Sequence, residues 1–588
     1  MTKPSSNIEK VIKAWSDVFL HFPLAVLSSW GFLFVIICDI HKIELGFDTA
    51  PVLYSLALGV LVFTVIRVFT KNRLFCLVGI MIVIAYFFEL HHGNGFKEFI
   101  RFFLTSLALF IMIVWGKNLS NNISNTQFWE SSKSIASNFL LSIVFTLSVI
   151  FGFMTSLKAM ELLFGFEIED KIYGDIFFSS IVFVGVNYFL YHLIDESKSS
   201  ENKFLSKANL IFTKYILTPI TIFYLLILYS YTFKILIDGV LPKGVLAWIV
   251  IGFTAIGVLT YLSWTPYWHE KNKKFKKIFI LAIFLQTLML GLAIYTRIAE
   301  YGWTVSRYLV VAYGVWLFGI CLYFLIKDDA KYKWIFISFS AILLISQYGA
   351  FSAYTVSYKD QLSRLTTLLQ DNKNLSEKTP IKIRYEISDK INYISKNFGI
   401  NSLKSTIPNI VDSFLSEHKL SNTNRLSYNI FYDFPLYATK KLGFKYVSFW
   451  QYKDATQNDK STNRVFKSIF LDYEQNKVIN IKDFDWEVEL TSAKDTTIED
   501  INTSFYLSYK TLLIKENKAK FKQIDLSKFF KNLIKNASGR YSIRMSQKQM
   551  SFNYKDKEVS IMIIFNNIDE KDQKIIHAGG TIYYKRFK

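Results

Sequence analysis

The sequence predicts a membrane-embedded all-α bundle of about eleven spans, followed by a soluble α+β domain rich in antiparallel strands. Three observations lead to this fold class. The chain of 588 residues is 51% hydrophobic, more than a soluble core of this size needs. Apolar residues in roughly the first 350 positions fall in blocks of about twenty, the length of a membrane-spanning helix. Beyond that point, apolar and polar residues alternate as in β-strands.

Each apolar block is interpreted as one span, after a short amphipathic N-terminal segment. The expected spans are residues 22–40, 51–69, 74–90, 99–115, 139–155, 175–194, 211–237, 245–264, 278–296, 308–326 and 334–350. The polar segment 121–138 is expected to be a loop with an interfacial turn near Phe128 and Trp129.

The loop charges predict the orientation of the bundle. About eighteen Lys and Arg residues lie in the loops on the N-terminal side, against about eight on the other side. This bias indicates a cytoplasmic N-terminus in a bacterial inner membrane, with the lipid bilayer as the main partner. An odd number of spans then places the C-terminal domain outside the cytoplasm, in the periplasm, and an even number would reverse that side.

We expect three regions: a transmembrane domain at 1–351, a connecting helix and linker at 352–379, and the soluble extracytoplasmic α+β domain at 380–588. In the soluble domain, a helix is expected from an N-cap at Ser388 to a stop at Gly399. A second helix is expected at 526–539, with Phe529, Phe530 and Leu533 on its inner face. The expected strands lie within 445–452, 467–473, 477–484, 503–515, 541–554, 558–565 and 580–587.

Composition excludes several classes of function. The net charge of +21 lies largely beside spans and suits lipid head groups, so we expect no nucleic-acid partner. All three cysteines fall in expected spans, which excludes a disulfide framework or a cysteine zinc site in the soluble domain. No phosphate-binding loop, dinucleotide fingerprint or nucleophile elbow is present, so we expect no catalytic residue, metal or cofactor. Adjacent histidines point apart on a helix, so we expect no metal at His91 and His92, which lie in a glycine-rich loop.

The polar stretch RIAEYGWTVSRY between two apolar spans is the main candidate site. It contributes Arg297, Glu300, Tyr301, Trp303, Arg307 and Tyr308. Arginines suit phosphate or carboxylate, and aromatic faces suit sugars, so the group could bind an external anion or glycan. Alternatively, Arg297 and Glu300 form an i,i+3 pair while the aromatic residues anchor the membrane interface.

A second candidate lies in the proline-containing span at 211–237. Lys214, Tyr215 and Tyr224 could form a polar site in the membrane for an anionic head group or substrate. Alternatively, the Lys214 side chain reaches the inner membrane surface and the tyrosines pack against neighbouring helices.

KYILTPITIFYLLILYSYTFKIL, LPKGVLAWIVIGFTAIGVLTYL, RIAEYGWTVSRY and AFSAYTVSYKDQLSRL together resemble a family of bacterial multipass membrane proteins, domain of unknown function 4153. The resemblance extends through YEISDKINYISKNFGINSL and LGFKYVSFW. It implies the two-part architecture and carries over no activity, cofactor or catalytic residue.

Three functions remain open. The first is a non-enzymatic envelope protein whose external domain binds a ligand or a protein partner, such as a small anion or another envelope protein. The second is a transporter or channel-like protein, against which the lack of carboxylates in mid-span counts. The third is a transferase for lipid-linked sugars, which would need Glu44 and Asp48 in the short first external loop.

Overall fold

The computed structural model describes most of the chain. It leaves out residues 1–6, 71, 91–94, 120–122, 165–167, 195–209, 239–244, 268–272, 418–427, 457–465, 472–483, 492–494, 499–502, 509, 517–518, 537–541, 572–573 and 588. The chain divides into two compact units. Met1–Asn374 with Lys390–Lys441 is called the helical unit below, and Leu375–Asp389 with Leu442–Lys588 is called the C-terminal unit.

The helical unit is built from long apolar helices. Their bounds are α1 (Asn7–His21), α2 (Pro23–Ile40), α3 (Thr49–Phe69), α4 (Phe75–Leu90), α5 (Gly95–Gly116), α6 (Asn125–Phe164), α7 (Asp170–Ser180), α8 (Asn187–Ile194), α10 (Thr218–Asp238), α11 (Val245–Ser263), α12 (Lys273–Tyr301), α13 (Val305–Ile326) and α14 (Lys333–Gln347). Less apolar helices follow: α15 (Ala353–Asp371), α17 (Pro408–Glu417) and α18 (Tyr428–Lys441). Helix α16 (Ile381–Phe398) contributes to both units.

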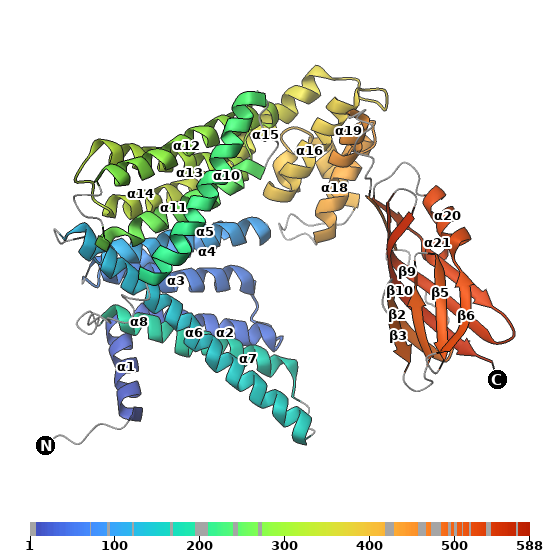
Figure 1. Cartoon of the computed structure of the whole chain (residues 1–588), viewed down its shortest axis with the longest axis horizontal. Coiled ribbons are helices and arrows are strands. Elements are labelled where there is room, and N and C mark those ends of the chain that lie inside the picture. The colour runs from blue at the N-terminus through green and yellow to red at the C-terminus, as the bar shows by residue number, and fades with distance from the viewer. Residues whose placement is uncertain are drawn as a thin grey trace. The chain divides into compact units, whose positions relative to one another are not determined.

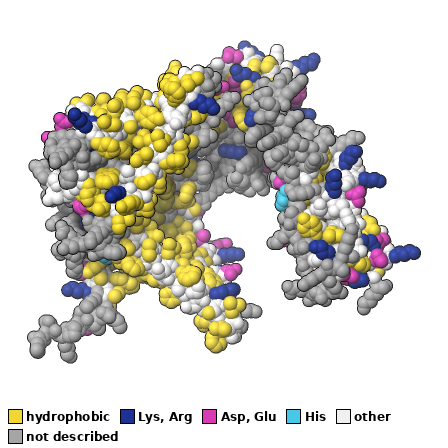
Figure 2. All heavy atoms as spheres, in the orientation of Figure 1, with side chains coloured by type: hydrophobic (Ala, Val, Ile, Leu, Met, Phe, Trp, Pro, Cys, Tyr) yellow, Lys and Arg dark blue, Asp and Glu magenta, His cyan; other side chains and the backbone are white. Residues whose placement is uncertain are grey.

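Within the described residues, eight helical stretches are long and apolar enough to cross a membrane. They are Pro23–Ile40, Thr49–Phe69, Lys97–Gly116, Asn125–Phe164, Asp170–Ile194, Leu210–Ile237, Lys274–Tyr301 and Val305–Ile326. Three further apolar helices are shorter, at Phe75–Leu90, Ile249–Ser263 and Lys333–Gln347. Hydrophobic side chains cover much of the helical surface shown in Figure 2, as expected where the surroundings are lipid. The fold class is confirmed in this form, and the count of eleven spans stays a prediction.

Neighbouring helices pack as antiparallel pairs. Helices α2, α3 and α4 lie side by side, and so do α12 and α13, while α14 packs against both α5 and α13 (Figure 1). Leu58 and Ile113 are buried in the core between α2, α3 and α5, and Leu317 is buried in the core of α13 and α14. This packing positions the ends of α5, α12 and α14, where the polar clusters described below are located.

Helix α6 corrects the expectation of a loop at 121–138, because the helix runs without a break from Asn125 to Phe164. Two polar residues of this segment find partners within the helix or in a neighbouring turn. The Ser132 hydroxyl donates to the Phe128 carbonyl at 2.8 Å, and the Asn125 amide donates to the Ala330 carbonyl at 2.8 Å. Phe128 is buried with its neighbours of α13 and α14. Tertiary packing therefore stabilises a helix where composition alone favoured a loop.

Two spans contain short π-helical segments, at Ile181–Val186 and Thr213–Leu217. The second lies just before Pro219, which has no N–H to donate to the preceding turn. The Thr213 carbonyl accepts from both the backbone N–H and the hydroxyl of Thr218, the latter at 2.7 Å. Single π-helical turns inside α-helices are frequent near functional sites.

The C-terminal unit contains two sheets. The strands are β1 (Phe466–Leu471), β2 (Trp486–Thr491), β3 (Asp495–Ile498), β4 (Thr503–Leu507), β5 (Thr511–Glu516), β6 (Ala519–Asp525), β7 (Ser542–Met545), β8 (Ser551–Lys555), β9 (Val559–Lys571) and β10 (Lys574–Arg586). One sheet has the order β2-β10-β9-β1-β7 with β8 also paired to β9, and the other has the order β3-β4-β5-β6. Among the strands that the structure describes, all pairs are antiparallel except β1 with β7, so the expected antiparallel character is confirmed.

Buried side chains join the two sheets into one core. The ring of Phe505 on β4 lies 5.1 Å from that of Tyr584 on β10, and both residues are fully buried. Helix α20 (Ser527–Asn536) turns Phe530 and Leu533 into the same core, and Phe529 packs at its edge. The predicted amphipathic helix is therefore confirmed, with its apolar face inward.

Several predictions for this unit were wrong. The expected strand at 503–515 is divided into β4 and β5, and the expected strand at 541–554 is divided into β7 and β8. The second half of the expected strand at 445–452 begins helix α19 (Phe449–Thr456), which Ser448 and Gln451 cap reciprocally. The Gln451 side chain accepts from the Ser448 backbone at 2.9 Å, and the Ser448 hydroxyl accepts from the Gln451 backbone at 3.4 Å. Ser388 is not an N-cap but lies inside α16, where its hydroxyl donates to the Arg384 carbonyl at 2.7 Å. Most of the expected strand at 477–484 lies outside the described residues.

Candidate functional site

The predicted polar stretch forms the tight turn between α12 and α13. Helix α12 ends at Tyr301, and Gly302 follows with a φ of +78°, a conformation that L-residues with a side chain rarely adopt. Thr304 then caps α13, its hydroxyl accepting from the Arg307 backbone N–H at 3.4 Å. The turn therefore reverses the chain within three residues and leaves several backbone polar groups to be satisfied by other elements.

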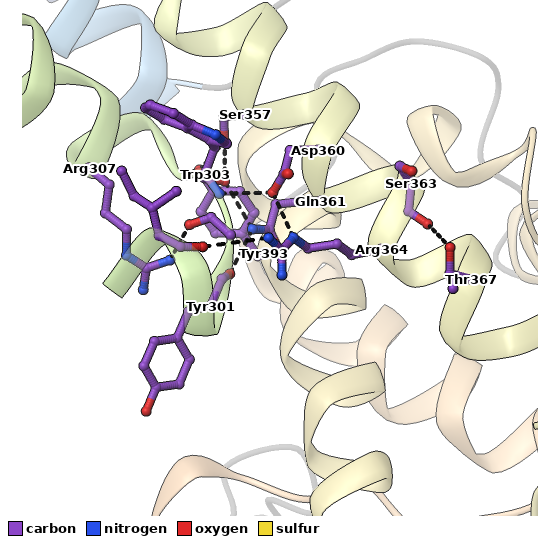
Figure 3. A network of polar contacts seen from close by, with 12 residues as sticks. Tyr301, Trp303, Arg307, Ser357, Asp360, Gln361, Ser363, Arg364, Thr367 and Tyr393 are labelled. Atoms are coloured by element: carbon purple, nitrogen blue, oxygen red, sulfur yellow. Dashed lines mark hydrogen bonds and ion pairs between the residues drawn. The ribbon is translucent and has the colours of Figure 1, made fainter. Parts of the chain in front are cut away.

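Side chains of α15 bind those backbone groups. The Asp360 carboxylate accepts a hydrogen bond from the Trp303 N–H at 2.8 Å. The buried Gln361 amide donates to the carbonyls of Tyr301 at 3.1 Å and Trp303 at 2.9 Å (Figure 3). A helix side chain that satisfies two neighbouring carbonyls fixes both the position and the rotation of its helix.

Three further residues, Ser357, Arg364 and Tyr393, complete this contact. We call it the stem clamp: the backbone of 301–305 with Ser357, Asp360, Gln361, Arg364 and Tyr393. The Tyr393 hydroxyl, from α16, accepts from the Val305 N–H at 2.9 Å and lies 2.8 Å from the Ser357 hydroxyl. The Arg364 guanidinium forms a 3.1 Å ion pair with Asp360, which orients the carboxylate toward the turn. All of these residues belong to the helical unit.

The stem clamp uses only part of the predicted anion or glycan cluster. Arg307 donates to the Gly302 carbonyl at 2.8 Å, and its guanidinium lies 5.4 Å from the centre of the Tyr301 ring. Trp303 packs beside Tyr308, whose hydroxyl donates to the Phe351 carbonyl. Arg297 and Glu300 form no ion pair with each other in the described part of the chain. The structure thus shows Tyr301, Trp303 and Arg307 at the stem contact, and anion or glycan binding by the cluster stays a prediction.

The second predicted cluster lies on the outer face of its span. Lys214 and Tyr215 fall in the π-helical segment, and the ammonium group lies 5.2 Å from the centre of the Tyr215 ring. Tyr215 and Tyr224 are both exposed on the helix surface. The opposite face of the span carries the polar contacts to α11, where the Thr221 and Thr260 hydroxyls lie 2.8 Å apart. A site at Lys214 would therefore face lipid rather than the interior of the bundle.

A buried charged cluster at the start of α5, which we call the Arg101 centre, was not singled out in the sequence. Arg101 is 7% exposed and donates from Nη1 to the Glu89 carboxylate of α4 at 2.5 Å. Its guanidinium carbon lies 4.6 Å from the ring centre of Tyr354 and 5.4 Å from that of Tyr348. Two tyrosine rings and one carboxylate thus surround the cation.

The Arg101 centre extends to a second cation and a second carboxylate. Lys97 lies one turn earlier in α5, with its ammonium group 5.2 Å from the ring centre of Tyr354. Glu98 is 7% exposed, which is unusual for a carboxylate and indicates charge compensation nearby. Burial raises the pKa of Tyr354 to about 12, so this tyrosine is neutral at physiological pH. The expected histidine pair, His91 and His92, lies outside the described residues.

The sequence carried one signal for the Arg101 centre. Lys97, Glu98 and Arg101 stand at i, i+1 and i+4 just where an apolar span begins, so they share one end of a helix. The expected span at 99–115 leaves Lys97 outside and Arg101 at its edge, whereas both cations lie within α5. In the described residues, no group of three or more His, Cys, Asp or Glu is placed to hold a metal ion.

The fold and these polar clusters define a helical membrane protein with a strand-rich C-terminal unit. Residues 53–377 match the family described as "Domain of unknown function (DUF4153)", more than half of the chain, and the chain belongs to this family. The match includes the turn at 301–305, Asp360 and Arg101, whereas Tyr393 lies beyond it.

An uncharacterised protein of Pasteurella multocida (strain Pm70) is 24% identical over 380 residues. The matched region covers 62% of this chain and 62% of that protein, so the chain spans less than two thirds of its relative's length. No solved structure matches the chain.

Proposed function

We propose that the protein is a non-enzymatic envelope protein of the bacterial inner membrane, whose C-terminal module binds a ligand or a protein partner. In this proposal, residues 1–351 anchor the protein, 352–379 form the stem, and 380–588 form the module outside the cytoplasm. The cytoplasmic N-terminus rests on the excess of Lys and Arg in the loops of that side.

The stem clamp is the observation that carries this proposal. Asp360 and Gln361 of α15 satisfy the backbone of the α12–α13 turn, and Tyr393 of α16 adds a third attachment to Val305. Tyr354, in the first turn of α15, also packs on Arg101. The stem clamp and the Tyr354–Arg101 contact therefore both hold α15 to the membrane helices. Such attachment is expected if the membrane helices support α15 as a stem. The C-terminal unit has its own buried core, as suits a binding module.

Photo-cross-linking in living cells tests the proposal. A photoreactive amino acid is placed at Lys531 or Lys548, both exposed on short helices of the C-terminal unit. The matched control position is Leu236, which is exposed on a membrane helix. We expect discrete protein or ligand adducts at the module positions and only lipid adducts at Leu236.

Truncation supplies the outcome that would overturn the proposal. A chain ending at residue 379 should fail to restore the phenotype of a deletion strain, because it lacks the binding module. Full restoration by the truncated chain, with no adduct at the module positions, would place the function in the membrane helices instead. A fusion of alkaline phosphatase to the C-terminus should be active, since that enzyme requires the oxidising side of the membrane.

A transporter or channel-like protein is the second candidate. The π-helical segments at Ile181–Val186 and Thr213–Leu217, together with buried polar contacts such as Thr221–Thr260, support this alternative. A transferase for lipid-linked sugars is less favoured, because the Asp48 carboxylate accepts from the Ala50 N–H at 3.3 Å and caps α3. Wild-type activity of a Glu44→Gln, Asp48→Asn variant would exclude the transferase.

A further inference from the structure

The Arg101 centre contains two buried hydrogen-bond donors with no partner. Arg101 donates one hydrogen bond in the described part of the chain, from Nη1 to Glu89, and its Nε atom is buried without an acceptor. The hydroxyl of Tyr86, on α4, is also buried without a partner, and this residue is 4% exposed. Unsatisfied buried polar groups are rare in native proteins, and a bound water or ion is one of their explanations.

The two donors belong to the same polar environment. Tyr86 is buried in the cluster against which Tyr348 packs, and the Arg101 guanidinium carbon lies 5.4 Å from the centre of the same Tyr348 ring. A guanidinium can donate two parallel hydrogen bonds to a pair of oxygen atoms from either of two edges. One of these edges carries Nε and Nη2. In Arg101 this edge is the one that Glu89 does not use. A ligand with several acceptor oxygens would satisfy this edge and the tyrosine together.

The position of Arg101 narrows the chemistry of that ligand. The apolar stretch of α5 begins at Lys97, so Arg101 lies about one turn inside the span, near the depth of lipid head groups. The formal charges of Lys97, Glu98, Arg101 and Glu89 cancel, so the centre carries no net negative charge that would repel an anion. The Glu89 side chain is 51% exposed and can turn toward solvent when a stronger anion binds.

We propose that Arg101 and Tyr86 bind a phosphate group, with the guanidinium edge of Arg101 gripping two oxygens and the Tyr86 hydroxyl donating to a third. The phosphate comes from a lipid head group or from inorganic phosphate, and both sources present the same oxygens. This site belongs to the membrane helices and stands apart from partner binding by the C-terminal module.

Thermal unfolding of the purified full-length protein in a maltoside detergent tests this assignment. The protein is titrated with sodium phosphate, or with phosphatidic acid and the matched diacylglycerol that lacks the phosphate. We expect one phosphate source to raise the melting temperature, while diacylglycerol leaves it unchanged. Protection by phosphatidic acid alone identifies a lipid ligand, and protection by sodium phosphate identifies the free anion.

Substitutions of Tyr86 and Arg101 distinguish a phosphate-binding site from an ion pair that only stabilises the fold. Tyr86→Phe should weaken phosphate binding by about tenfold and Arg101→Lys by at least as much, since each removes a hydrogen bond to a charged group. Tyr295→Phe and Arg73→Gln are the matched controls, because Tyr295 is 71% exposed and Arg73 is exposed and forms no ion pair in the described residues. Both controls should respond as wild type does.

Tyr86→Phe keeps the test decisive if the arginine variants do not fold. Without a ligand, this variant should be at least as stable as wild type, because it loses an unpartnered buried hydroxyl. Equal protection of wild type and Tyr86→Phe by phosphate, or no protection of either, would overturn the proposal and leave the Arg101 centre as a structural contact.

Discussion

The carboxylate of Asp360 accepts a hydrogen bond from the backbone N–H of Trp303 at 2.8 Å, and this bond joins a helix outside the apolar bundle to a turn between two membrane helices. Asp360 can reach the backbone only because Gly302, the residue before Trp303, has no side chain. A Cβ atom at Gly302 would lie 2.3 Å from the Asp360 carboxylate oxygen. The glycine therefore serves both the positive φ of the turn and the approach of α15.

Replacement of Gly302 should loosen the stem. In Gly302→Ala, the alanine would adopt an unfavourable φ and displace Asp360, so we expect a loss of about 1–3 kcal/mol in the free energy of unfolding. Thermal unfolding of the detergent-solubilised protein measures this change. Gly319→Ala on α13 is the matched control, because nothing lies within 4 Å of its Cβ position, and it should be neutral or slightly stabilising. Equal stability of the two variants would contradict the role of Gly302.

Gln361 should determine how firmly α15 is held. Gln361→Leu removes the amide donor of the Tyr301 and Trp303 carbonyls and leaves Trp303 with only the longer 3.4 Å bond from Ser357. We expect this loss to cost about 1–3 kcal/mol. Amide hydrogen exchange within 353–371 should become faster while exchange within α13 stays slow. Thr367→Val is the control, since within the described residues the Thr367 hydroxyl bonds to the Ser363 carbonyl of its own helix and to no other element. Unchanged exchange in Gln361→Leu would show that the other contacts suffice.

The sequence predicted one side of the stem clamp and not the other. The stretch 297–308 was recognisable because polar and aromatic residues interrupt two apolar spans. Its partners Asp360 and Gln361 lie more than fifty positions later, in a helix whose pattern shows only that one face is apolar. Pairing between distant polar residues depends on how the helices pack, and a hydrophobic period contains no such information.

The errors in the helical unit have a similar physical cause. The segment at 121–138 is polar enough to read as a loop, yet Asn125 is held by Ala330 and Tyr332 in a distant turn. Arg101 and Lys97 looked like loop charges because they stand at the edge of an apolar block. Their burial among Tyr348 and Tyr354 depends on residues some 250 positions away. Local composition predicted the spans, whereas long-range contacts decided which polar residues are buried.

The turn between β8 and β9 should make the C-terminal unit sensitive to acid. A hydrogen bond from Lys522, with further bonds from the N–H groups of Glu558 and Val559, holds the pKa of Asp556 well below its usual value. A carboxylate with a lowered pKa stabilises the fold at pH values above its unfolded pKa of about 3.9, and that stabilisation is lost as the pH falls further. We therefore expect unchanged hydrogen-exchange protection of 551–565 from about pH 7 to pH 5 and a decline below about pH 4.

Asp556→Asn isolates this effect. The variant should be less protected than wild type at neutral pH, and its protection should depend less on acid, because the ionised carboxylate is missing. Glu489→Gln on the exposed face of β2 is the control and should keep the wild-type dependence on pH. An identical acid response in wild type and Asp556→Asn would assign the sensitivity to other carboxylates.

Tyr354 should make the helical unit sensitive to alkali. Its side chain is 5% exposed between Arg101 and Lys97, and burial raises its pKa from the ordinary value of about 10 to about 12. Below pH 10 the phenol is neutral in both the folded and the unfolded chain, so its full contribution to stability is present. Between about pH 10 and pH 12 the unfolded chain loses the proton first, so stability falls across that window.

Thermal unfolding from pH 8 to pH 11.5 measures this effect. The melting temperature should fall less steeply with pH for Tyr354→Phe than for wild type. Tyr295→Phe, which alters a tyrosine that is 71% exposed, should retain the wild-type slope. Equal slopes for all three proteins would show that the phenol of Tyr354 ionises as easily in the folded chain as in the unfolded one.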